Sequence, residues 1–138
     1  MEPSRIEYPP VYRPSAVQAR PLWTGERPSG RLARRLCETA AAASASAFAI
    51  PVGELYARTR RSSYVALARQ SAMYLAHVAF GVPLSEVAAA FGRDRTTAAH
   101  ACRLIEDRRD DPAIDVLLAS LEDACRALRR RMAAPVAP

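Results

Sequence analysis

The chain has 138 residues, which is room for one domain of ordinary size with tails. Half of its residues are apolar and only 7% are aromatic. Small apolar side chains suit closely packed helices better than a β-sandwich, so we expect an all-α fold. The formal net charge of +6 at neutral pH fits a polyanionic partner.

The cysteine and histidine content argues against a metal site. Cys37, Cys102 and Cys125 are far apart and form no CxxC pair, and the only histidines are His77 and His100. A structural zinc site needs four ligands in close pairs, so we expect no metal or other cofactor, and free buried thiols. No apolar run approaches the ~20 residues of a membrane span, and the N-terminus lacks the apolar core of a signal peptide. We therefore expect a cytoplasmic protein without a membrane partner.

Prolines and apolar spacing divide the chain into a tail, a helical domain and a short end. Residues 1–29 hold six of the eleven prolines without an apolar period, so we expect them to be disordered or extended. Residues 30–132 should form one compact multi-helix domain. Residues 133–138 are expected to be a C-terminal tail.

Five helices are predicted before the C-terminal one. Their expected ranges are 31–49, 52–58, 64–79, 84–91 and about 95–107. Pro51 ends the first helix because proline removes a backbone donor, and Gly81 and Gly92 are expected at helix ends. A basic loop, Arg58 to Ser63, separates the second and third helices. The side chains expected to face inward from the first three helices are Leu32, Leu36, Ala40, Val52, Leu55, Tyr56, Ala68, Ala72, Leu75 and Ala79.

The helix after Gly92 has an apolar side and a polar side. The side expected to pack on the scaffold carries Ala98, Ala101, Cys102 and Ile105. The opposite side and its flank carry Thr96, Thr97, His100 and Arg103. A short helix, a glycine turn and a second helix opened by polar residues are typical of a helix-turn-helix, here over residues 84–107. The second helix of that motif enters the DNA major groove.

A long last helix is predicted from about 112 to 132. Its apolar residues have heptad-like spacing: Ile114, Leu118, Leu121, Cys125, Leu128 and Met132. We expect the first half to pack on its own domain. Beyond Cys125 the helix either overhangs the core or pairs with a second protomer in a homodimer. The charged run from Arg108 to Asp111 is predicted to be a solvated helix end rather than a catalytic pair.

Three segments occur in the order RQSAMYLA, SEVAAAFG and GRDRTTAAHACRLIE within residues 52–121. This stretch resembles the C-terminal DNA-binding domain of the bacterial replication initiator DnaA, whose signature runs close to GRDHTTVLHACRKI. The resemblance implies a helix-turn-helix and a double-stranded DNA partner. The sequence departs from the signature in three places. Gly92 stands alone where the family has two glycines, Arg95 replaces a histidine, and Leu104 replaces a lysine.

The resemblance also implies which residues contact DNA. Arg69, in the RQ dipeptide, is expected in the minor groove, and the basic loop is expected on the DNA backbone through Arg58, Arg60 and Arg61. The recognition element corresponds to Arg93, Asp94, Arg95, Thr96, Thr97 and His100, and Arg103 should contact phosphate. Two roles stay open for Asp94: it caps the helix, or it accepts from a cytosine amino group. Arg95 favours guanine O6 and N7.

We therefore expect sequence-specific double-stranded DNA binding by a stand-alone regulator of transcription or replication. These 138 residues contain no GxxxxGK[ST] loop and no lysine, so neither a nucleotide nor the initiator's ATPase module is expected. The alternative is a protein-interaction adaptor that uses the helical domain and the C-terminal apolar stripe, with little or no specific DNA binding. An enzyme is not expected, because no carboxylate pair lies near a nucleophile and no cofactor loop is present.

Overall fold

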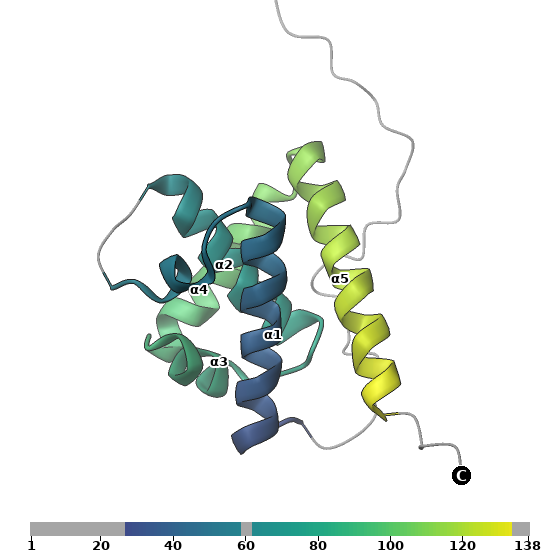
Figure 1. The fold of residues 1–138 in the computed structure, drawn as a ribbon. Helices are drawn as coiled ribbons and strands as arrows, with labels where there is room; N and C mark the ends of the chain where they lie inside the picture. Colours follow the sequence, from purple (N-terminus) through teal and green to yellow (C-terminus); the bar gives the residue numbers. More distant parts are fainter. Residues whose placement is uncertain (1–26, 59–61, 134–138) are drawn as a thin grey trace, which may run out of the picture.

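The computed structural model describes residues 27–58 and 62–133, and within them every regular element is helical. The elements are α1 (Gly30–Phe48), the 3-10 helix η1 (Val52–Tyr56), α2 (Ser63–Val78), α3 (Leu84–Phe91), α4 (Arg95–Arg108) and α5 (Pro112–Ala133). Helix α2 packs against both α1 and α4, and α3 packs on α4 and α1. Helix α5 lies on the outside, against α1 and α2 (Figure 1). The expected all-α fold is confirmed.

The predicted helix limits are close to the observed ones except in the segment after Pro51. There the expected helix over 52–58 is a short 3-10 helix that ends at Tyr56. Gly81 follows α2 with a φ of 71°, and the Val82 N–H donates to the Ala76 carbonyl at 3.0 Å. The turn therefore forms where the glycine was expected. Most of the two expected tails, at residues 1–26 and 134–138, lies outside the described residues.

Small side chains allow the central helices to approach closely. Ala68, Ala72 and Ala76 on α2 are fully buried, and Ala40 and Ala41 on α1 are buried as well. A polar contact joins the same two helices, since the Ser44 hydroxyl on α1 donates to the Ala68 carbonyl at 2.6 Å. Alanine packing against alanine leaves little room for a larger side chain, so this interface tolerates little change in volume.

All three cysteines are buried and free, as expected. Burial raises the pKa of Cys37 and of Cys102 to about 12, and that of Cys125 to about 11. Because the thiolate is the nucleophile and the metal ligand, these thiols are structural rather than reactive.

Three side chains predicted to face inward are exposed instead. Leu32 is 38% exposed, because the buried stripe of α1 is centred on Ala33, Leu36, Cys37 and Ala40 and leaves it at the edge. In η1 only Leu55 is buried, while Val52 is 46% and Tyr56 is 38% exposed. A single turn offers one position to the core, and Leu55 fills it. The Tyr56 ring stacks on the Phe91 ring, with the two centroids 5.4 Å apart.

The apolar stripe of α5 is buried only in its first part. Leu118 and Cys125 are buried, and Ile114 and Leu121 pack partly against the core. Leu128 is 40% and Met132 is 48% exposed. The expectation that the first half packs on its own domain is therefore confirmed. Pairing of the exposed end with a second protomer stays a prediction.

The prediction of a solvated charge run at residues 108–111 is wrong for Arg109. Its guanidinium is buried among α2, α4 and α5, and it donates to Asp115 at 2.7 Å, to the Tyr74 hydroxyl at 3.0 Å and to Glu122. Burial opposes the charge, but the hydrogen bond to Asp115 and the charge of Glu122 outweigh it and raise the pKa of Arg109. A buried charge needs partners of this kind, and two of them, Tyr74 and Glu122, are more than ten residues away in the sequence.

Candidate nucleic-acid interface

A tight turn connects α3 to α4. Gly92 has a φ of 64°, and the N–H of the next residue, Arg93, donates to the Ala88 carbonyl at 2.9 Å. The N–H of Gly92 donates to the Ala89 carbonyl at 3.2 Å. These two bonds form a Schellman motif, which ends α3 and turns the chain sharply. The expected glycine turn between the two helices is therefore present.

Asp94 caps the N-terminus of α4. Its Oδ1 accepts a hydrogen bond from the Thr97 N–H at 2.7 Å, and the residue has extended backbone angles. The hydrogen bonds from Thr97 hold the pKa of this carboxyl below its ordinary value. Of the two roles left open for Asp94, the structure shows helix capping. A contact with a cytosine amino group stays a prediction.

The two sides of α4 differ in the way that the sequence predicts. Its buried residues are Ala98, Ala101, Cys102 and Ile105, which pack on the core. Its exposed polar residues include Arg95, Thr96, Thr97, His100 and Arg103. The exposed side offers hydroxyl groups, an imidazole and two guanidinium groups to a partner. No part of the described structure covers these side chains.

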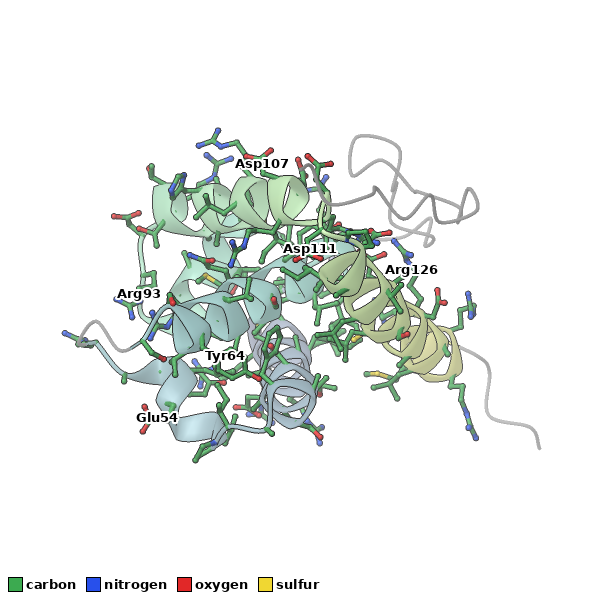
Figure 2. All side chains as sticks on the ribbon, turned by 90° about the horizontal axis from the view of Figure 1, so that it is seen from above. Glu54, Tyr64, Arg93, Asp107, Asp111 and Arg126 are labelled. Atoms are coloured by element: carbon green, nitrogen blue, oxygen red, sulfur yellow. The ribbon has the colours of Figure 1, made fainter. Side chains whose placement is uncertain are left out.

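An open groove runs between the first half of α4 and the middle of α2. Its lining residues are Arg58, Arg69, Gln70, Met73, Arg93, Thr97, His100 and Ala101. Arg93 lies at one end of the molecule, away from Asp111 and Arg126 (Figure 2). The groove therefore combines three arginines with two exposed polar side chains of α4.

Arg69 and Arg93 both bind backbone within this groove. Arg69 donates from Nε to the Leu55 carbonyl at 2.8 Å and from Nη2 to the Ala57 carbonyl at 3.2 Å. Arg93 donates from Nη2 to the same Ala57 carbonyl at 2.9 Å. Burial, and then the charge of Arg93, lower the pKa of Arg69. The two guanidinium groups thus meet at one acceptor.

The arrangement of α3, the Gly92 turn and α4 has a counterpart among known proteins. Residues 38–105 match the sequence model described as the bacterial DnaA protein helix-turn-helix. These residues belong to the DnaA helix-turn-helix family. The matched segment runs from α1 to near the end of α4 and stops before Arg109 and α5. A DnaA-type helix-turn-helix suggests that the domain binds double-stranded DNA.

The fold brings five of the sequence-predicted site residues together. Arg58, Arg69, Arg93, Thr97 and His100 line the groove, while Arg95, Thr96 and Arg103 are exposed on α4 outside its lining. Arg60 and Arg61 lie outside the described residues.

Sequence reasoning missed two kinds of participant in this site. Gln70 and Met73 line the groove beside Arg69, and their spacing along α2 could have indicated this. The Ala57 carbonyl is a backbone group that accepts from two distant arginines. No side-chain pattern identifies such an acceptor.

In residues 27–58 and 62–133, no three His, Cys, Asp or Glu side chains lie close enough together to hold a metal ion. No helix in that part of the chain is both long and apolar enough to cross a membrane.

Proposed function

We propose that this protein binds specific double-stranded DNA sequences by inserting α4 into the major groove, and that it regulates transcription or replication as a stand-alone DnaA-type domain. The observation that carries the proposal is the division of α4 into a buried apolar side and an exposed polar side directly after the Gly92 turn. A recognition helix needs this division, because one side must pack on the scaffold while the other contacts base edges.

The proposed contacts fall into two classes. Arg95, Thr97 and His100 offer groups that suit base edges: a guanidinium for guanine, and hydroxyl and imidazole groups that donate or accept. Thr96 and Arg103 on α4, with the basic residues Arg58, Arg60 and Arg61, suit phosphates and position the protein on the duplex. Charge supports the second class, since a net charge of +6 favours any duplex regardless of sequence.

Arg95 supports a sequence preference different from that of the initiator. Its guanidinium is exposed at the first position of α4 and offers a planar set of N–H donors. A histidine in that position donates fewer hydrogen bonds and titrates near neutrality. We therefore propose that the preferred site carries an additional guanine opposite Arg95.

The test is selection of binding sites from a random duplex library with the intact chain, at a stated near-physiological salt concentration. Enrichment of one motif supports specific DNA binding. If the motif resembles the initiator's own box, TTATNCACA, a replication-linked role is favoured. If it contains a new guanine, an independent transcription regulator is favoured. Retention that depends on salt without enrichment contradicts specific binding.

A second candidate function, a protein-interaction adaptor, is favoured by the exposed end of α5. Leu128 and Met132 are both exposed there, four residues apart on one side of the helix. A homodimer through this end would bury both side chains. Sedimentation of wild type and of Leu128→Asp tests this homodimer. If wild type is a dimer through this end of α5, the variant should be a monomer; if wild type is already a monomer, the homodimer is contradicted.

A further inference from the structure

The Ala57 carbonyl joins three separate parts of the fold. It accepts from Arg69 on α2 at 3.2 Å and from Arg93, before α4, at 2.9 Å. The segment that carries it leaves η1, where the Ala57 N–H donates to the Glu54 carbonyl at 3.3 Å. Arg69 also donates from Nε to the Leu55 carbonyl at 2.8 Å. Four hydrogen bonds therefore define the path of residues 54–57.

Bringing two guanidinium groups to one carbonyl has an electrostatic cost. Partial burial and, after it, the charge of Arg93 lower the pKa of Arg69, which means that the surroundings disfavour its charge. Two like charges stay together only where an acceptor between them compensates. The shared carbonyl is such an acceptor, since its oxygen has two lone pairs and can take a hydrogen bond from each arginine.

The location of Arg93 gives these contacts a consequence for α4. Arg93 directly precedes the capping residue Asp94, and its own N–H donates to Ala88 in the turn. The side chain is thus tied to Ala57 while the backbone belongs to the start of α4. Arg58, the residue after Ala57, is exposed and lines the same groove as Thr97 and His100. The bond between Arg93 and Ala57 therefore fixes the position of the Arg58 backbone relative to the start of α4.

We infer that Arg69 and Arg93 are positioning residues, which fix residues 55–58 against the start of α4 so that Arg58 and the exposed side of α4 meet the same duplex. The inference rests on the proposed function for the duplex, but the contacts themselves belong to the free protein. It departs from the minor-groove contact that the family resemblance implies for Arg69. A guanidinium already bound to two carbonyls acts on DNA through the segment that it holds.

The first test uses the free protein and needs no DNA. The exchange of arginine Nε–H protons with water is measured by NMR, and the Arg69 signal is identified as the one missing in Arg69→Lys. Arg69 Nε–H should exchange at least about tenfold more slowly than the Nε–H of exposed Arg103, because it donates to Leu55. Equal exchange rates for Arg69 and Arg103 would overturn the inference whether or not the protein binds DNA.

The second test measures duplex affinity for variants that keep the charge. Lysine retains a positive charge but lacks the planar fork that spans two carbonyls. We expect Arg69→Lys to weaken binding about tenfold, and the control Arg103→Lys to weaken it by less than about threefold. Because Arg69 acts through Arg58, adding Arg58→Gln to Arg69→Lys should cost less than about a further twofold.

Direct DNA contact by Arg69 predicts different results. Arg69→Lys would then bind DNA with an affinity within about threefold of wild type. In the double variant, the fold-losses of affinity from Arg69→Lys and Arg58→Gln would multiply. Either result would overturn the inference. The far-UV circular dichroism spectrum checks that each variant folds. Should Arg69→Lys fail this check, Arg93→Lys removes the other bond to Ala57 and is expected to show the same dependence on Arg58.

Discussion

At the scale of single residues, Asp94 shows how α4 begins. Its carboxylate accepts the Thr97 N–H at 2.7 Å and so satisfies one of the backbone donors that the first turn of α4 leaves unpaired. A negative charge at this position also interacts favourably with the helix dipole. Capping therefore explains why an acidic residue lies within an otherwise basic surface.

The capping role predicts a specific dependence on pH. The pKa of Asp94 is lowered in the folded protein, so its contribution to stability is present above its ordinary pKa of about 4 and is lost as pH falls through the lowered value. Serine also caps helices but does not titrate there. We expect the stability of wild type to fall relative to Asp94→Ser on acidification to about pH 3. Denaturant unfolding at pH 6 and pH 3 measures this difference, and a constant difference would contradict it.

At the scale of elements, two helices end with the same backbone motif but different residues. Ala49, the residue after α1, has a φ of 55°, and the Ile50 N–H donates to the Ala45 carbonyl at 3.0 Å. Gly92, the residue after α3, has a φ of 64°, and the Arg93 N–H makes the equivalent bond to the Ala88 carbonyl. The left-handed conformation is unfavourable for alanine and costs glycine nothing sterically. Ala49 is therefore a strained position and Gly92 is not.

Substituting glycine for alanine at position 49 and alanine for glycine at position 92 should change stability in opposite directions. Ala49→Gly should stabilise the fold by about 1 kcal/mol, and Gly92→Ala should destabilise it by a similar amount. A Cβ at Gly92 would meet no atom within 4 Å, so its expected loss comes from the backbone conformation rather than from a clash. Urea unfolding of each variant checks the signs. Effects of the same sign would contradict this explanation.

At the scale of the whole molecule, Arg109 attaches α5 to the DnaA-type domain. The family match ends at residue 105, and Arg109 follows it at the end of α4. Its guanidinium contacts Tyr74 on α2 and both Asp115 and Glu122 on α5. Glu122 is only 1% exposed and also accepts from Arg126 at 3.3 Å. A buried ion network thus links the matched segment to the helix beyond it.

Removing the guanidinium should leave the buried Glu122 carboxylate poorly compensated. We expect Arg109→Met to destabilise the protein by about 3 kcal/mol, since breaking one side of a buried pair is costly. Adding Glu122→Gln should recover part of the loss, because a neutral amide costs less to bury than a charge. Denaturant unfolding of the single and double variants measures both effects. A loss below about 1 kcal/mol in Arg109→Met would show that Arg109 is not essential for attaching α5.

The sequence predicts the helices and the orientation of α4 because these depend on local signals. Gly92 directly follows α3 and Pro51 directly precedes η1, and the spacing of Ala98, Ala101, Cys102 and Ile105 identifies the buried side of α4. Long-range partners leave no such signal. Arg109 lies in a run of six charged residues, Glu106 to Asp111, yet it is buried because Glu122 and Tyr74 approach it from other helices. Similarly, only the folded chain brings two arginines to one carbonyl.

The central claim is that α4 contacts bases while the basic loop, Arg58 to Ser63, contacts the DNA backbone. It is tested most directly by measuring the affinities of His100→Ala and Arg58→Gln for the enriched duplex and for a scrambled one, across a range of salt concentrations. His100→Ala should lose about 1–3 kcal/mol on the enriched duplex and little on the scrambled one. Arg58→Gln should weaken both duplexes and reduce the salt slope by about 1. Equal losses on both duplexes for His100→Ala would contradict base contact by α4.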